Sequence, residues 1–289
     1  LYEALHCHVR AKLNEHYGDE IVSNSNPLPV HMLGNMWGQS WSNIYDLVYP
    51  KQDEISTVNL TKIIEERNLS EIDMVEYAED FFISIGFEAL PETFWERSLF
   101  VKPLDRSVVC HASAWNLDPA NNDLRIKMCI ERNEEDFITI HHELGHIFYY
   151  QAYNHLPTLF QGGANDGFHE AFGDLLTLSI TPEYLKKIDF INQEEADLAE
   201  EDFIGLLMKQ ALEGVVIIPW ALMLDKWRAG IFKGDITEDN LNESWWEMRK
   251  NYQGIVPPSE RSEAYFDAGA KYHIPGNTPY TRYYLARIM

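Results

Sequence analysis

The chain has 289 residues and a formal net charge of −23, because 46 acidic side chains stand against 23 basic ones. Hydrophobic residues make up 45% and charged residues 24% of the sequence. This composition is typical of one or two globular domains and excludes disordered, collagen-like and small disulfide-rich proteins. A surface this negative repels phosphate groups, so the charge disfavours nucleic acids and anionic membrane surfaces as partners.

Helical spacing of apolar residues dominates the chain. It predicts helices over approximately 1–17, 35–49, 59–67, 70–85, 134–153, 167–180, 200–229 and 237–251. Alternation typical of strands is confined to 107–112 and 124–129, which predict a short hairpin around the turn-rich residues 118–123. Residues 253–279 are rich in proline and glycine, which indicates a long irregular loop of the kind that often carries function.

The ends of the chain and its apolar runs bear on targeting. The longest apolar run, 214–224, contains a proline, and a membrane span needs about 20 apolar residues. We therefore expect no membrane anchor in this chain. It begins with a helical pattern, without an initiator methionine, an N-cap or the layout of a signal peptide. We expect it to be a piece of a longer protein.

Two features indicate a secreted or extracellular protein. Sequons for N-glycosylation occur at Asn59, Asn68 and Asn242, and the first two lie close together. Two of the three cysteines, Cys110 and Cys129, flank a short segment. Sequons and paired cysteines are typical of oxidising compartments.

A metal-binding pattern, HELGH, occupies residues 142–146 inside the helix expected over 134–153. Residues four positions apart lie on one helix face, so the imidazoles of His142 and His146 can reach the same ion. Zinc prefers such nitrogen ligands, and a catalytic zinc site uses three protein ligands and a water molecule. Glu143 lies between the histidines, where it can take a proton from that water.

The next predicted helix offers the third ligand. Glu170 and Asp174 are four residues apart and share one helix face, and Asp166 is a candidate N-cap for this helix. We expect Glu170 to bind the metal, and Asp174 to orient a ligand histidine through its second ring nitrogen. The sequence thus predicts a zinc hydrolase with one zinc ion per chain.

Five separated motifs resemble the angiotensin-converting enzyme family, the peptidyl-dipeptidase A zinc metallopeptidases. The motifs occur in the family's order as 33–37 (LGNMW), 109–115 (VCHASAW), 141–146 (HHELGH), 167–171 (GFHEA) and 269–275 (GAKYHIP). The resemblance runs through the whole chain. The family domain is longer, and its N-terminal portion and last helices have no counterpart here, so we expect 1–289 to be a single partial peptidase domain.

The resemblance implies a mainly helical fold of the gluzincin type. It implies a small β-hairpin near the zinc helix and a substrate cleft between two helical halves. It also implies dipeptidyl carboxypeptidase activity, in which dipeptides are released from oligopeptides with a free C-terminus. His142, His146 and Glu170 match the family's zinc ligands, and Glu143 matches its general base and acid.

The resemblance further assigns residues that bind substrate. Gln39, Lys271 and Tyr280 match the group that holds the terminal carboxylate of the peptide. His111 and His273 match residues that donate hydrogen bonds to substrate carbonyls, and Ala112 matches a backbone contact. Tyr283 matches the phenol that stabilises the oxyanion. The residues alone favour a solvated loop lysine for Lys271 and aromatic packing for Tyr280 and Tyr283.

Two further features come from the resemblance. Trp245 and Arg249 match one chloride site of the family and Arg282 matches another, so chloride is a possible second cofactor, although Arg249 also reads as part of an ordinary helix salt bridge. Cys110 and Cys129 match a family disulfide that tethers the loop of His111. Such a disulfide contributes about 3 kcal/mol in the chain-entropy account.

Two other functions remain open on the sequence. One is a related zinc oligopeptidase that cuts peptides internally, against which Gln39, Lys271 and Tyr280 argue. The other is a peptide-binding homologue without catalysis, against which the intact zinc motif and Tyr283 argue.

Overall fold

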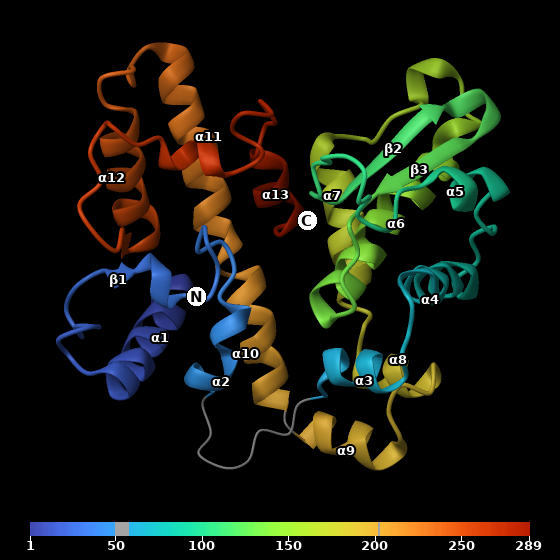
Figure 1. Cartoon of the computed structure of the whole chain (residues 1–289), viewed down its shortest axis with the longest axis horizontal. Helices are drawn as coiled ribbons and strands as arrows, with labels where there is room; N and C mark the ends of the chain where they lie inside the picture. Colours follow the sequence, from blue (N-terminus) through green and yellow to red (C-terminus); the bar gives the residue numbers. More distant parts are fainter. Residues whose placement is uncertain (50–57, 202) are drawn as a thin grey trace. The chain divides into compact units, whose positions relative to one another are not determined.

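The computed structural model describes residues 1–49, 58–201 and 203–289 (Figure 1). It is mainly helical with a small antiparallel hairpin, as the sequence predicts. The chain divides into two compact units, one formed by residues 58–197 and the other by 1–57 with 198–288. The expected cleft between two helical halves stays a prediction.

The unit of residues 58–197 contains the predicted zinc helix. Its elements are α3 (Leu60–Glu66), α4 (Glu71–Ser84), α5 (Glu92–Arg97), β2 (Ser113–Asp118), η3 (Pro119–Asn121), β3 (Asp123–Lys127), α6 (Glu134–Asn154), η4 (Thr158–Phe160), α7 (Asp166–Thr177), α8 (Pro182–Lys187) and the start of α9 (Gln193–Glu201). One apolar core joins α4, α6 and the hairpin, and Phe82 of α4 stacks on Phe148 of α6 with ring centroids 4.3 Å apart. The zinc helix is therefore a core element of this unit.

The second unit combines both ends of the chain. Its elements are α1 (Tyr2–Tyr17), β1 (Leu28–Pro29), η1 (Val30–Met32), η2 (Ser42–Ile44), α2 (Tyr45–Val48), α10 (Phe203–Gly214), α11 (Ile217–Lys233), α12 (Leu241–Gln253), β4 (Ile255–Val256), η5 (Asp267–Ala270) and α13 (Thr281–Ala286). β1 and β4 pair in parallel through Leu28 and Ile255, which joins the N-terminal segment to the end of α12. Its apolar residues form two clusters, one around α1 and α10 and one around α11 and α12.

Several predicted elements are wrong in detail. Residues 35–41 form turns, and only 42–48 of the expected helix 35–49 are helical. The expected helix 200–229 is divided into α10 and α11, with a break at 215–216. The first hairpin strand follows 107–112 instead of occupying it, so both cysteines lie outside the strands. Asn165, not Asp166, caps α7, because its side chain accepts the Phe168 amide.

One stretch differs from the expectation of no membrane span. Residues Ile204–Lys233, which include most of α10 and all of α11, are long and apolar enough to cross a membrane, and an 18-residue window within them has a mean hydropathy of 1.5. Only 28% of the most apolar window is buried, although Trp220, Leu224 and Trp227 are fully buried. Because core helices of soluble proteins meet the same criterion, this is weak evidence for a span.

Candidate active site

Helix α6 positions the two histidines of the HELGH motif. The Asn133 side chain caps it by accepting the Asp136 amide at 2.8 Å, as predicted. The face expected to be buried has no solvent exposure; its members are Phe137, Ile140, Leu144, Ile147 and Phe148. This packing fixes the rotation of α6 about its axis and turns His142 and His146 to the face that meets α7.

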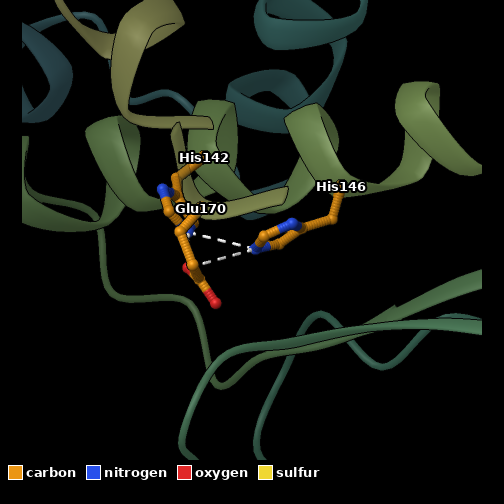
Figure 2. A group of neighbouring side chains, drawn as sticks. All are labelled: His142, His146 and Glu170. Atoms are coloured by element: carbon orange, nitrogen blue, oxygen red, sulfur yellow. Dashed lines mark hydrogen bonds and ion pairs between the residues drawn. The ribbon is translucent and has the colours of Figure 1, made fainter. Parts of the chain in front are cut away.

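The three predicted ligands converge (Figure 2). His142 Nε2 and His146 Nε2 are 3.1 Å apart, and Glu170 Oε2 lies 3.3 Å from the first and 3.7 Å from the second. The three ligand atoms all lie within 4.8 Å of one another. Two ligands of a tetrahedral zinc ion are about 3.3 Å apart when each lies 2.0–2.1 Å from the metal. The donor set and its spacing therefore fit zinc.

Two glycines that no local sequence pattern singles out allow α6 and α7 to approach closely. A Cβ at Gly145 would lie 2.9 Å from the Cα of Gly173, and a Cβ at Gly173 would lie 2.7 Å from His142 Nδ1. Both distances are below ordinary carbon contacts. Any side chain at either position would separate the helices or displace His142, so these glycines are part of the site.

Asp174 lies behind the first histidine. Its Oδ1 is 3.3 Å from His142 Nδ1, while the Nε2 of the same ring faces Glu170. Burial opposes protonation of His142, but Asp174 and Glu170 outweigh it and raise the pKa of His142 well above its usual value. A metal cation at Nε2 would take the place of that proton.

Glu143 is buried with 7% of its surface exposed. Burial raises the pKa of Glu143 to about 7; the positive charge of His142 opposes this rise and the carboxylate of Glu170 adds to it. Among the described residues, no group forms a hydrogen bond with Glu143 Oε2. A buried carboxylate oxygen without a partner is costly. It is therefore available for a proton or a water molecule at the metal site.

The predicted substrate residues of this unit lie just before the hairpin. Cys110 and Cys129 form a disulfide, which tethers the segment containing His111 to the second residue after β3. His111 is exposed and Ala112 is half-buried. Their contacts with substrate stay predictions.

The second unit brings together the residues predicted to hold a carboxylate. Lys271 is 6% exposed, and its Nζ donates to Gln39 Oε1 at 2.6 Å. The ammonium also lies over the rings of Trp37 and Tyr280, at 4.8 and 5.7 Å from their centroids. No acidic residue of the described chain forms an ion pair with it. Burial alone lowers the pKa of Lys271 to about 8, so a solvated loop lysine is the wrong interpretation.

His273 and Tyr283 form a pair next to that group. His273 Nε2 is 3.0 Å from the Tyr283 hydroxyl, and the His273 ring packs edge-on against Tyr280. The short helix α13, which carries Tyr283, starts where Asp225 accepts the amides of Tyr280 and Thr281. Asp225 thereby fixes the start of the helix.

The predicted chloride residues occupy an aromatic environment. Arg249 is 2% exposed, and its guanidinium lies 4.9 to 5.7 Å from the ring centroids of three tryptophans, Trp220, Trp245 and Trp246. It donates to Gln253 Oε1 and to the Trp37 carbonyl. Burial lowers its pKa to about 9. An ordinary helix salt bridge is therefore the wrong interpretation, while Arg282 is half-buried on α13.

The three sequons differ in accessibility. Asn59 and Asn68 are exposed, and Asn59 caps α3. Asn242 is fully buried: its Nδ2 donates to the Ser262 carbonyl and to Asp267, and its Oδ1 accepts the Asp267 amide. This burial argues against the predicted glycan at Asn242, because the folded chain encloses the nitrogen that would carry it.

Comparison with known proteins agrees with this site. The family model described as "Angiotensin-converting enzyme" matches residues 1–289. The angiotensin-converting enzymes of Bos taurus and Sus scrofa are 44% and 45% identical to the chain over its full length, and the chain covers 22% of each. That of Theromyzon tessulatum is 42% identical, with 46% of its length covered. The chain thus spans less than half the length of these relatives, yet it retains the zinc-binding pattern. It belongs to the angiotensin-converting enzyme family.

Proposed function

We propose that the chain carries the active-site residues of a zinc-dependent dipeptidyl carboxypeptidase, which releases dipeptides from oligopeptides with a free C-terminus. Family membership and the ligand set of His142, His146 and Glu170 support one zinc ion per chain. The observation that carries the specificity is the buried ammonium of Lys271. It has an amide partner in Gln39 and no acidic partner among the described residues. A substrate carboxylate would supply the missing negative charge.

A zinc ion held by His142, His146 and Glu170 would supply a Lewis acid that polarises a water molecule and the scissile carbonyl. Glu143 accepts a proton from the attacking water at its unpaired Oε2 and returns it to the leaving nitrogen. Burial of Glu143 disfavours its charged form, which favours uptake of a proton from water. Asp174 accepts the Nδ1 proton of His142, which leaves the Nε2 lone pair for the metal.

The remaining residues hold the peptide. Lys271, Gln39 and Tyr280 bind the terminal carboxylate of the peptide. His273 and His111 donate hydrogen bonds to substrate carbonyls, and Ala112 contacts the peptide backbone. Tyr283 donates a hydrogen bond from its hydroxyl to the oxyanion. A preorganised donor at this position contributes most to stabilising the transition state.

One assay separates this function from internal cleavage. The full-length protein is incubated with a peptide that has a free C-terminus and with the same peptide amidated at that end, and the products are identified by mass spectrometry. We expect dipeptide release from the free acid and strong resistance of the amide. Equal cleavage of both peptides, or cleavage far from the C-terminus, would show an oligopeptidase. Zinc binding without cleavage of either would show a catalytically silent peptide-binding homologue.

We also propose that the protein is extracellular and that it binds chloride. The disulfide and the exposed sequons at Asn59 and Asn68 support the location. Arg249 is a buried cation among tryptophans, and its hydrogen-bond partners among the described residues are the neutral Gln253 amide and the Trp37 carbonyl. This environment supports an anion at Arg249 and Trp245. Arg282 is the candidate for a second anion. Dependence of the peptidase rate on chloride concentration tests the anion sites.

A further inference from the structure

His169, next to the metal ligand Glu170, links the second ligand histidine to a tyrosine. His169 Nδ1 lies 3.3 Å from His146 Nδ1, and His169 Nε2 lies 2.9 Å from the Tyr153 hydroxyl. Neither contact was expected from the sequence. Tyr153 is 7% exposed and is held in α6, seven residues after His146. The two histidines and the tyrosine therefore form a continuous hydrogen-bonded line that ends at the predicted zinc site.

The direction of the protons along this line follows from the ligand atom. His146 Nε2 faces His142 and Glu170, so it is the nitrogen whose lone pair binds the metal. A neutral histidine that ligates through Nε2 carries its proton on Nδ1. His146 must then donate, and His169 Nδ1 must accept. The proton of a neutral His169 is therefore on Nε2, from which it is donated to the Tyr153 oxygen.

We infer that His169 is a positioning residue that orients His146 for zinc, with its tautomer set by Tyr153; the inference rests on the proposed zinc site. His169 lies behind His146 as Asp174 lies behind His142, but His169 is not an acidic residue. His142 lies against a carboxylate, whereas His146 lies against an imidazole. The site thereby gains a second oriented histidine without a further buried negative charge, which would be costly.

Packing holds the His169 ring in place. The ring lies 4.5 Å from that of Tyr149 and 4.9 Å from that of Tyr150, measured between centroids. A Cβ at Gly163 would lie 2.8 Å from His169 Cδ2, so the ring rests directly on the backbone of that loop. These contacts restrict the ring and keep Nδ1 directed at His146.

Two substitutions at His169 separate the hydrogen bond from the packing. In His169→Asn, the amide oxygen can replace Nδ1 as the acceptor, and it needs no tautomer. In His169→Phe, the ring remains but the acceptor is lost. We measure zinc affinity of the full-length protein by competition with a chelator. His169→Phe should weaken zinc binding about 10- to 100-fold, the usual effect of removing a partner of a ligand, and His169→Asn should restore most of it. Equal affinities of all three proteins would overturn the inference.

Tyr153 provides a second, independent test. Tyr153→Phe should weaken zinc binding about threefold or more, since it removes one buried hydrogen bond that sets the tautomer. The same change in the His169→Asn background should have almost no effect, because asparagine has no tautomer to set. Tyr149→Phe is the matched control: the Tyr149 ring packs against the same histidine, but its hydroxyl accepts the Ala164 amide instead. An equal loss from Tyr153→Phe in both backgrounds would assign Tyr153 a packing role only.

The wild-type protein tests the inference even if a variant fails to fold. In the zinc-loaded protein labelled with nitrogen-15, NMR should show His169 protonated on Nε2 and His146 protonated on Nδ1. A His169 proton on Nδ1 would overturn the proposed direction. A wild-type protein that binds no zinc would instead refute the proposed function, so the two failures are distinguishable.

Discussion

Lys271 donates from its Nζ to Gln39 Oε1 across 2.6 Å, although 232 positions separate the two residues in the chain. This contact joins the N-terminal segment of its unit to the loop after α12. A buried ammonium has lost most of its hydration, and a single neutral amide does not replace it. This lost hydration lowers the pKa of Lys271 to about 8.

Lys271→Met should abolish the preference for a free C-terminus. The substitution keeps an apolar side chain of similar length and removes only the charge. Loss of one partner of a buried charge pair costs about 2–5 kcal/mol, so kcat/KM for the free-acid peptide should fall about 30-fold or more. The amidated peptide should be almost unaffected. An equal loss on both peptides would assign Lys271 a structural role.

Lys226→Met is the matched control for that experiment. Lys226 also lies over an aromatic ring, with its Nζ 5.1 Å from the centroid of Tyr252, but its side chain is exposed. Its removal changes the net charge of the protein by the same amount. It should leave the ratio of free-acid to amide cleavage unchanged, so a change in that ratio would indicate a long-range charge effect.

The pKa of Lys271 also predicts a pH dependence. Carboxylate binding needs the charged ammonium, so kcat/KM for the free-acid peptide should fall as the pH rises through about 8. The amidated peptide should lack this alkaline limb. The stability of the fold should change with pH in the opposite direction. The unfolded chain keeps the lysine proton up to the ordinary pKa of 10.5, whereas the folded chain loses it at about 8. The free energy of unfolding should therefore rise between about pH 8 and 10.5. Lys271→Met should remove both effects, and a limb that persists in the variant would contradict the assignment.

Glu143→Gln should keep zinc and lose turnover. Glutamine has the same shape but accepts no proton, and Glu143 is not among the three clustered ligand atoms. General-base catalysis contributes about 10²–10⁴-fold, so kcat should fall at least about 100-fold while metal analysis still finds one zinc per chain. Zinc loss in this variant would show that Glu143 is a ligand, and full activity would exclude it as the base.

The zinc site was predictable because its information is local. The ligands of α6 are four residues apart, and the helix has its own cap in Asn133 and a continuous apolar face. The spacing of Glu170 and Asp174 on α7 is local in the same way. The close approach of Gly145 to Gly173 cannot be predicted from local sequence, because it depends on which faces of the two helices meet.

The errors have tertiary causes. Residues 35–49 have helical spacing, but Gly38 has a φ of 60° and lies against Val30 and Arg249, which a helix at this position would not permit. The six-residue helix α13 is too short to be stable alone, and Asp225, 56 positions before Thr281, supplies its first contacts. Asn242 matches a sequon, but its burial depends on Asp267. None of these contacts can be inferred from local periodicity.

Glycosylation should follow accessibility and not the sequon pattern. Expressed through the secretory pathway, the protein should carry glycan at Asn68 or Asn59 and none at Asn242, because Asn242 is enclosed. Site-by-site mass spectrometry after enzymatic deglycosylation measures this. Asn242→Gln should lower stability by about 1–3 kcal/mol, since buried hydrogen bonds to Asp267 are disturbed, whereas Asn68→Gln should have little effect on stability. A glycan at Asn242 would contradict the described packing of α12.

Gly173→Ala should impair zinc binding although it changes no ligand. The added methyl would lie 2.7 Å from His142 Nδ1, on the side of the ring that meets Asp174. Either the ring turns and its contact with Asp174 is lost, or α7 moves away and takes Glu170 with it. Loss of such support typically weakens metal affinity about 10- to 100-fold.

Gly162→Ala is the matched control, because a Cβ there meets nothing within 4 Å. Zinc affinity measured by chelator competition should fall only in Gly173→Ala. Wild-type affinity in that variant would show that the contact between α6 and α7 does not set the geometry of the site.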